Sequence, residues 1–218
     1  MPTLLSTKTL TIPQRELLLN TGLGFVEHDF IQTKPLLFSK PKNLENLIFT
    51  SQNAVHYFFE KIKNHELVNT NAFCVGTKTK IAIEQKGLKV VEMTQTAAIL
   101  AHTLVEKYKN VSFLFICGKK RRNELPLILK ENEVSIEELV IYDTLESPIT
   151  ITRLFDGILF FSPSAVQSYS RINKIGTQHC FCIGTTTANT IDKPAIQVTV
   201  ANKSTIENVI VQAVKFFK

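Results

Sequence analysis

Two stretches of the chain, IFTSQNAV (48–55) and LFFSPSAV (159–166), repeat one pattern. Alignment of Ser51 with Ser162 sets them 162 − 51 = 111 residues apart and also matches the Ala-Val pair. A second pair, FCVGT (73–77) and FCIGT (181–185), lies 184 − 76 = 108 residues apart. Two motifs in the same order at nearly the same offset indicate a duplicated structural unit.

Each motif consists of a short apolar strand, a turn with a hydroxyl side chain, and a helical pattern. Ser51 and Ser162 are expected to cap the helices that follow, because a serine oxygen accepts from unpaired N–H groups of the first turn. The stretch FLFICGKKRRNELPLIL (113–129) repeats the pattern, with Gly118 at the end of its strand. Strands that alternate with helices predict an α/β fold with doubly wound parallel sheets.

The same patterns predict the remaining elements. Helices are expected over 13–20, 54–63, 79–86, 96–109, 164–174 and 205–217. Strands are expected over 7–11, 25–30, 46–50, 71–75, 89–92, 112–117, 138–142, 157–161, 181–183 and 195–198. This number of strands suits two sheets better than one.

Two extended segments that contain proline, Ile31–Pro35 and Tyr142–Pro148, are typical of connectors. Between them lies a run that is itself the size of a domain. We therefore expect one discontinuous α/β domain over 1–34 and 146–218, and an inserted α/β domain over 35–145.

The composition is that of a globular protein of 218 residues, 44% of them hydrophobic, with a net charge of +6. Its longest apolar runs are too short to span a membrane, and the start MPTLLSTKTLTIPQ lacks the apolar core of a secretion signal, so we expect a cytoplasmic protein. The one dense basic run, 119–122, is explained by a solvated face or by a polyanionic small molecule.

Cysteine and histidine spacing predicts no metal site. All four cysteines lie in apolar strand patterns without paired C-x-x-C spacing, as expected for reduced, buried thiols. The five histidines share no ligand spacing and are expected at the surface. The chain also lacks a G-x-S-x-G elbow, a P-loop and a G-x-G-x-x-G fingerprint, which argues against hydrolases, NTPases and dehydrogenases.

Taken together, FTSQNAV, FFSPSAV, the glycine turns CVGTKT and CIGTTTA, ICGKKRRNELP and VIYDT resemble the uroporphyrinogen-III synthase family. The resemblance runs from Ile48 to Ile191. It implies two flavodoxin-like domains joined by a two-stranded connector, with the active site in a cleft lined by helix N-termini. It also implies a monomeric enzyme of heme and tetrapyrrole biosynthesis that cyclises hydroxymethylbilane, inverts the terminal pyrrole and releases water without a cofactor.

The resemblance also implies roles for individual residues. Tyr142, in VIYDT, corresponds to the tyrosine that assists departure of the hydroxyl group. The expected substrate-binding residues combine hydroxyls, turn glycines and cations; they are Thr50, Ser51, Gly76, Thr77, Gly118, Lys119, Arg122, Ser162, Ser164, Gly184, Thr185 and Thr186. Helix N-termini and hydroxyls there would receive a substrate with eight carboxylates.

The sequence also fits other interpretations. Helix capping alone explains Ser51 and Ser162 without a ligand. Gln52 and Lys78 depart from the family pattern, which weakens the transfer of roles to the first copy of the motif. A non-catalytic two-domain protein that binds an anionic metabolite fits the same features, whereas nucleic-acid binding is disfavoured because the basic run is short and lacks interleaved aromatics.

Overall fold

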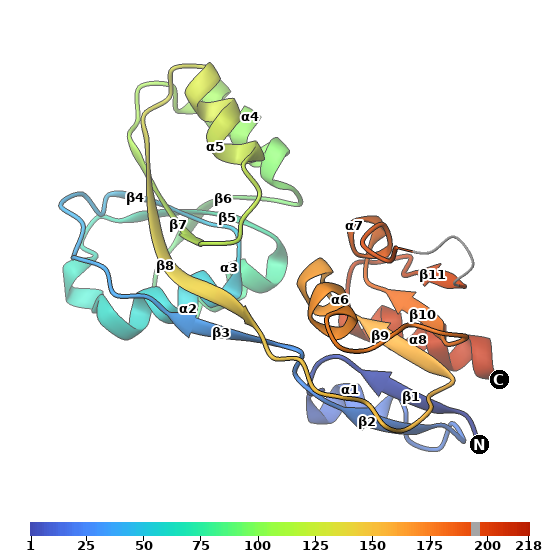
Figure 1. Ribbon diagram of the computed structural model, residues 1–218. Helices are drawn as coiled ribbons and strands as arrows, with labels where there is room; N and C mark the ends of the chain where they lie inside the picture. The colour runs from blue at the N-terminus through green and yellow to red at the C-terminus, as the bar shows by residue number, and fades with distance from the viewer. Residues whose placement is uncertain (193–196) are drawn as a thin grey trace. The chain divides into compact units, whose positions relative to one another are not determined.

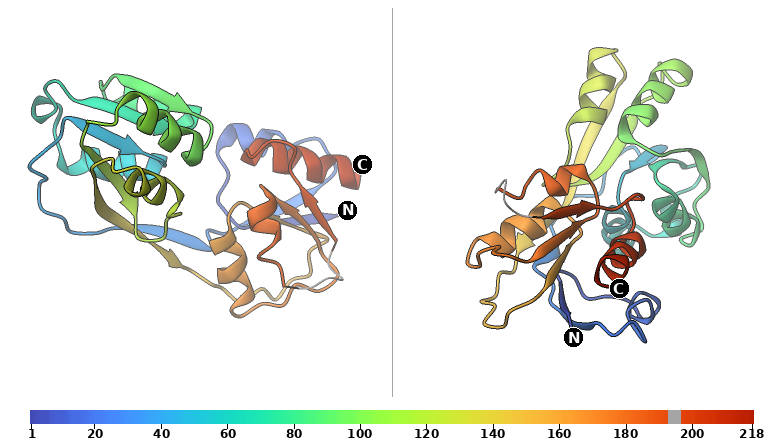
Figure 2. Two further views of the ribbon diagram at one scale, coloured as in Figure 1. Left: turned by 90° about the horizontal axis from the view of Figure 1, so that it is seen from above. Right: turned by 90° about the vertical axis from the view of Figure 1, so that its right-hand side faces the viewer.

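The β-strands form two separate sheets in the computed structural model, which describes residues 1–192 and 197–218 (Figure 1). The chain divides into two compact units: unit 1 comprises Met1–Gln32 and Leu145–Lys218, and unit 2 comprises Thr33–Thr144. In each unit helices lie on both faces of the sheet (Figure 2). The fold is therefore α/β with parallel sheets, as the sequence predicts.

Unit 1 contains a five-stranded sheet in the order β11-β10-β9-β1-β2, and every pair of neighbours is parallel. Its strands are β1 (Thr3–Ser6), β2 (Gly24–Glu27), β9 (Gly157–Phe160), β10 (His179–Cys182) and β11 (Val198–Val200); its helices are α1 (Ile12–Glu16), α6 (Pro163–Ser170), α7 (Thr185–Ala188) and α8 (Ile206–Phe217). Central β9 is buried on both faces: Ile158 packs with α6, whereas Leu159 packs with α8.

Unit 2 contains a six-stranded sheet in the order β3-β8-β7-β4-β5-β6. Its strands are β3 (Ile31–Pro35), which begins before the unit boundary, β4 (Asn46–Phe49), β5 (Asn71–Val75), β6 (Val90–Thr94), β7 (Phe113–Gly118) and β8 (Ile136–Glu146), which runs past it. Its helices are α2 (Gln52–Lys61), α3 (Thr77–Glu84), α4 (Ala97–Lys107) and α5 (Glu124–Glu131), with a short 3₁₀ turn η1 (Asn64–Glu66). Phe49 packs on the α2 and α3 face, and Ile48 packs on the α4 and α5 face.

The two sheets share one arrangement of five strands. Unit 1 reads β11-β10-β9-β1-β2, and unit 2 reads β6-β5-β4-β7-β8 with β3 added beside β8. The repeated motifs occupy matching places, because β4 corresponds to β9 and β5 to β10. The chain order differs: in unit 1 the pair β1 and β2 comes first, whereas in unit 2 the corresponding pair β7 and β8 comes last. The units are therefore circular permutations of each other, which explains a repeat that covers only part of each unit.

The helix starts agree with the predicted caps. The Ser51 Oγ accepts from the Ala54 N–H at 3.1 Å, and the Ser162 Oγ accepts from the Ala165 N–H at the same distance. Both serines have extended backbone, so the helices begin one residue later. Capping therefore accounts for one hydrogen bond of each serine.

The N-terminal segment departs from the predicted elements. A strand was expected over 7–11, but β1 is Thr3–Ser6, because the fully buried Leu4 and Leu5 occupy the centre of the sheet. Thr9 instead binds the side chain of Asp29 through its N–H, at 2.8 Å. The expected helix over 13–20 is the shorter α1. Of the strand expected over 195–198, residues 195 and 196 lie outside the described residues, and β11 begins at Val198.

One histidine contradicts the expectation that all five are exposed. His179, at the start of β10, is buried, with its ring 4.6 Å from that of Phe181 and 4.0 Å from that of Phe216. Its two ring nitrogens lie at hydrogen-bond distance from Gln197 Oε1 and Thr199 Oγ1. Hydrogen-bond partners on β11 (Thr199) and on the residue before it (Gln197) thus allow an imidazole to be buried in the sheet. Sequence spacing alone does not show these partners.

The cysteines are buried and reduced, as the sequence predicts. Burial raises the pKa of Cys74 and Cys117 to about 11 and that of Cys180 and Cys182 to about 12, so the thiols stay protonated at neutral pH. Within the described residues, no cluster of three His, Cys, Asp or Glu side chains is arranged to hold a metal. In the same part of the chain, no helix is long and apolar enough to cross a membrane.

A buried hydroxyl in α6 generates a prediction for stability. The Ser168 side chain is fully buried, and its Oγ has no hydrogen-bond partner among the described residues. Because an unsatisfied buried hydroxyl costs about 1–3 kcal/mol, Ser168→Ala should raise the free energy of unfolding by about 1 kcal/mol in urea denaturation. Ser204→Ala, at an exposed position, should change it by less than about 0.5 kcal/mol. Destabilisation of Ser168→Ala would show that the hydroxyl has a partner.

Candidate active site

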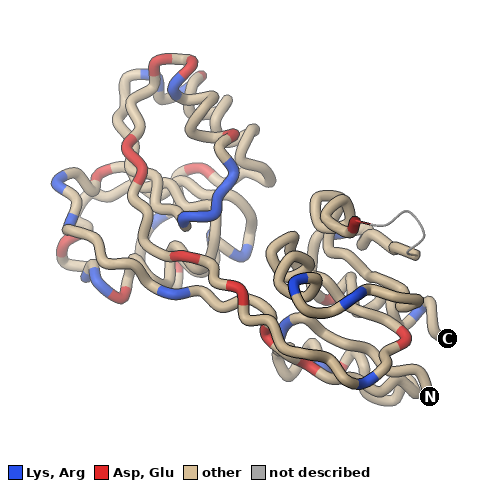
Figure 3. The backbone as a smooth tube through the Cα atoms, in the orientation of Figure 1, with Lys and Arg blue, Asp and Glu red and all other residues tan. Residues whose placement is uncertain are grey.

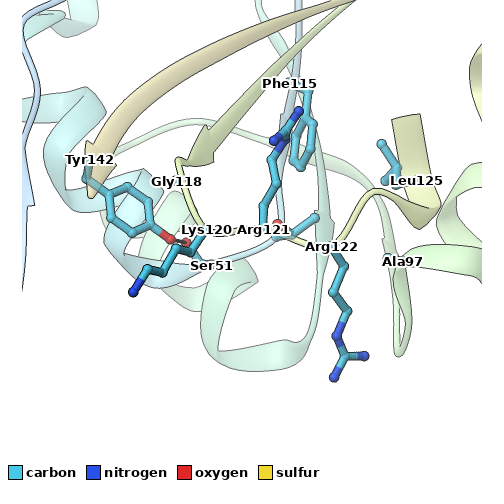
Figure 4. A pocket seen from close by; sticks show the side chains of 10 residues that line it. Ser51, Ala97, Phe115, Gly118, Lys120, Arg121, Arg122, Leu125 and Tyr142 are labelled. Carbon is cyan, nitrogen blue, oxygen red and sulfur yellow. Dashed lines mark hydrogen bonds between the residues drawn. The ribbon is translucent and has the colours of Figure 1, made fainter. Parts of the chain in front are cut away.

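A pocket of about 320 Å³ lies in unit 2, at the carboxyl ends of β4 and β7 (Figure 4). It combines an apolar part, two hydroxyl side chains at the end of β4, a phenol and three cations. The lining residues are Thr50, Ser51, Ala97, Phe115, Gly118, Lys120, Arg121, Arg122, Leu125 and Tyr142. Ligands of doubly wound proteins bind at this edge of the sheet. The structure thus brings together five of the predicted residues: Thr50, Ser51, Gly118, Arg122 and Tyr142.

A register shift in the sheet aims Tyr142 into this pocket. β7 and β8 pair regularly up to Cys117 and Val140, and the next pair joins Gly118 to Tyr142, so Ile141 is an extra residue. Such a bulge breaks the alternation of side chains and redirects those that follow. Ile141 is fully buried in the core, and the neighbouring Tyr142 is 8% exposed. Without the bulge, successive residues would face opposite sides of the sheet.

Gly118 leaves the space that the phenol occupies. A Cβ atom at this position would lie 2.5 Å from Cζ and 2.9 Å from the hydroxyl oxygen of Tyr142. Both distances are shorter than any non-bonded contact a carbon tolerates, so a side chain here would displace the ring. Glycine is thus required by the approach of Tyr142, a reason that differs from the binding role expected from the sequence.

Ser51 connects the phenol to the start of α2. Its Oγ lies 3.0 Å from the Tyr142 hydroxyl (Figure 4). The same oxygen accepts the Ala54 N–H. A serine hydroxyl has one proton and two lone pairs, so Ser51 can accept from Ala54 and donate to Tyr142 at the same time. In that arrangement the Tyr142 proton remains available for a ligand in the pocket.

The environment keeps that proton in place. Burial raises the pKa of Tyr142 above its ordinary value of 10.0, and the hydrogen bond with Ser51 offsets only part of the rise. The phenol is therefore neutral at physiological pH. In this state the phenol can donate a hydrogen bond.

The basic run 119–122, part of the blue in Figure 3, follows β7. Its residues have different partners. The Lys119 ammonium lies 3.7 Å from the Asp143 carboxylate, and Lys119 is not among the pocket residues. Arg121 lines the pocket but is held by Glu138, which also pairs with Lys130 at 3.0 Å. The sequence-based prediction named Lys119 and Arg122 but not Lys120 and Arg121, which also line the pocket, because successive loop residues have no fixed period that shows which side chain turns inward.

The other predicted residues lie at further strand ends. Gly76 and Thr77 follow β5 beside β4, and Gly76 caps α3 with a left-handed backbone (φ 85°) that favours glycine. The remainder belong to unit 1 and follow β9 and β10; they are Ser162, Ser164, Gly184, Thr185 and Thr186. These two strands are neighbours, so their ends form one edge of the unit 1 sheet.

Fold and pocket together define a class: an α/β protein whose sheet edge carries hydroxyl donors and cations suited to an anionic small molecule. A family model described as uroporphyrinogen-III synthase HemD matches residues 16–210. The chain therefore belongs to the uroporphyrinogen-III synthase family. Its activity is that of a cofactor-independent cyclising lyase of heme biosynthesis.

Individual relatives agree with this assignment. The chain is 25% identical over 206 residues to the uroporphyrinogen-III synthase of Chlorobaculum parvum (strain DSM 263 / NCIMB 8327), covering 81% of this chain and 82% of that protein. The crystal structure of uroporphyrinogen-III synthetase from Helicobacter pylori 26695 matches with a TM-score of 0.76 at 19% identity, over 99% of this chain and 100% of that one. A mutant uroporphyrinogen III synthase from the extremely thermophilic bacterium Thermus thermophilus matches with a TM-score of 0.65 at 14% identity, over 99% and 98%. These two structures support the fold.

The contact between Gly118 and Tyr142 predicts the effect of one methyl group. Gly118→Ala should displace the phenol and lower kcat/KM for tetrapyrrole cyclisation about a hundredfold, as expected for a misplaced catalytic group. Gly176→Ala is the matched control, because a Cβ there first meets the Gln178 side chain at 3.4 Å. Activity of Gly118→Ala within threefold of the wild type would contradict the requirement for glycine.

The position of Lys120 predicts a role in binding. Lys120→Ala should raise KM about threefold to tenfold and change kcat less than about twofold, because a surface cation contributes mainly to uniform binding of an anion. The difference should shrink at high salt. Steady-state kinetics at two ionic strengths, with Lys109→Ala as the exposed control, would measure it. An unchanged KM would remove Lys120 from the binding site.

Proposed function

We propose that this chain cyclises hydroxymethylbilane to uroporphyrinogen III and that Tyr142 assists the departure of the terminal hydroxyl group. The observation that carries the proposal is the neutral phenol of Tyr142, held at 3.0 Å from Ser51 in a pocket that also contains Lys120 and Arg122. A weak acid beside cations matches a substrate that carries both a leaving hydroxyl and many carboxylates.

The chemistry requires little acid–base machinery. The carbon–oxygen bond of the hydroxymethyl group breaks, and the oxygen leaves with the electron pair while the electron-rich pyrrole stabilises the cationic carbon. The substituted carbon of the last pyrrole attacks this cationic carbon and forms a spiro intermediate. The bond that joined the last pyrrole to its neighbour then breaks, and a new bond forms at the unsubstituted carbon of the last pyrrole, which closes the macrocycle with that ring inverted. The last pyrrole then loses a proton and regains aromaticity. This proton and the departed hydroxide together make up the released water. A hydrogen bond from Tyr142 stabilises the negative charge on the leaving oxygen.

Substrate carboxylates are proposed to contact hydroxyls and backbone N–H groups at strand ends. In unit 2, Thr50 and the loop after Gly118 supply such donors, and Ser51 is proposed to contribute through the Tyr142 phenol to which it donates. The predicted groups of unit 1, Ser162, Ser164, Gly184, Thr185 and Thr186, are proposed to bind further carboxylates, as are Gly76, Thr77 and Lys119 of unit 2. Holding a flexible chain in a bent conformation lowers the entropic part of the barrier.

The two units are proposed to be flavodoxin-like domains, with boundaries at 1–34 and 146–218 for the first and 35–145 for the second. Numbered along the chain, the unit 1 strands have the order 2-1-3-4-5, which is typical of that fold. Unit 2 has the same order when counting begins at β7 and continues at β4. Adjacent β3 and β8 are proposed to form the two-stranded connector.

The alternative of a non-catalytic binding protein is not favoured, because the family match covers nearly the whole chain. We also propose a cytoplasmic monomer without nucleic-acid or membrane partners. In the only dense basic run of the sequence, Lys119 and Arg121 are already paired with Asp143 and Glu138. These ion pairs reduce the positive electrostatic potential that would attract the phosphate backbone of a nucleic acid.

The wild-type protein incubated with hydroxymethylbilane should form the type III isomer, and Tyr142→Phe should form it about a hundredfold more slowly with little change in unfolding temperature. Separation of the type I and type III products measures both. Any loss of rate due to ionisation of Tyr142 should begin at a higher pH than for an ordinary tyrosine, because burial raises the pKa of this phenol. Tyr108→Phe serves as the control tyrosine. Spontaneous type I product alone from the wild type would reject the function, whereas an unchanged rate for Tyr142→Phe would reject only the role of Tyr142.

A further inference from the structure

Tyr57 is a second tyrosine beside the site that is not among the pocket residues. It lies on α2, six residues after the cap residue Ser51, and its ring centroid is 5.7 Å from that of Tyr142 with an interplanar angle of 31°. Aromatic rings at this distance attract each other beyond their shared burial. Tyr57 therefore restrains the ring of Tyr142 without touching the pocket.

The hydroxyl of Tyr57 is fixed by a residue of β3. It donates to the Thr33 carbonyl oxygen at 2.9 Å and lies 2.8 Å from Thr33 Oγ1. Because the single phenolic proton goes to the carbonyl, Thr33 Oγ1 must be the donor in the second bond. Both bonds of the phenol go to one residue, the first of unit 2 after the chain enters it. The ring of Tyr57 is thus held at one end by β3 and contacts Tyr142.

We propose that Tyr57 is a positioning residue, held by Thr33, which keeps the Tyr142 phenol in line with its hydrogen bond to Ser51. The inference rests on the proposed function of Tyr142. Ser51 contacts only the hydroxyl group of the phenol. Gly118, which lies beside the ring, has no side chain that could restrain it. Contact with a second, anchored ring limits rotation of Tyr142 about its side-chain bonds, so its proton stays directed toward the substrate.

Double-mutant kinetics separates this role from a merely structural one. Tyr57→Leu removes the ring contact and should lower kcat roughly threefold to tenfold, with KM nearly unchanged. In a Tyr142→Phe background the same substitution should have an effect below about twofold, because no phenolic proton remains to be positioned. Tyr108→Leu, which loses a ring contact with Phe73 in the same unit, should leave kcat within about twofold.

Two further variants keep the test decisive should Tyr57→Leu fold poorly. Tyr57→Phe retains the ring and loses both bonds to Thr33, and Thr33→Val loses only the bond from Oγ1; each should lower kcat about twofold to threefold and have no effect when combined with Tyr142→Phe. Losses that multiply with that of Tyr142→Phe, or an unchanged kcat in folded variants, would overturn the positioning role. Absence of type III product from the wild type would instead reject the proposed function, so the two failures are distinguishable.

Discussion

The geometry of the pocket depends on one register shift, in which β8 places an extra residue opposite the junction of Cys117 and Gly118. A regular strand would send either Ile141 or Tyr142 out of the sheet face that it now occupies. The bulge allows Ile141 to remain fully buried while Tyr142 lies across Gly118. Core packing and the position of the phenol are thus satisfied by the same irregularity, which is why neither can change alone.

Acidic residues on the same strand determine the electrostatics of the pocket. Glu138 is partly buried, which acts to raise its pKa, but hydrogen bonds from Arg121 and Lys130 outweigh burial, and the pKa is lowered. Glu138 therefore stays ionised and holds Arg121, while Asp143 lies near Lys119. A run of four cations consequently does not act as a uniform positive patch: β8 pairs with Lys119 and Arg121, whereas Lys120 lines the pocket without an ion pair to any of the described residues.

Sequence patterns predicted the elements whose signal is local. Strand β4 with its Ser51 cap and strand β9 with its Ser162 cap follow from apolar runs that end at a hydroxyl, and both are found where expected. Features that depend on non-local contacts were missed. The position of β1 is decided by burial of Leu4 and Leu5 between β2 and β9, strands that lie far apart in the chain. The bulge and the buried imidazole of His179 likewise depend on partners in neighbouring strands.

The strands that lead out of the two units correspond to each other. In unit 1 the equivalent of β8 is β2, the last strand before the chain leaves that unit at Gln32; β8 leads out of unit 2, whose last residue, Thr144, lies two positions beyond Tyr142. The segment that enters the unit carries Thr33, which anchors Tyr57. Of the two strands that cross the unit boundary, β3 is therefore hydrogen-bonded to Tyr57 and β8 carries Tyr142. The direct contacts of the phenol are with Ser51 and Tyr57 of α2. The boundary strands are proposed to add to its orientation, because β3 anchors Tyr57 through Thr33 and β8 carries Tyr142 itself.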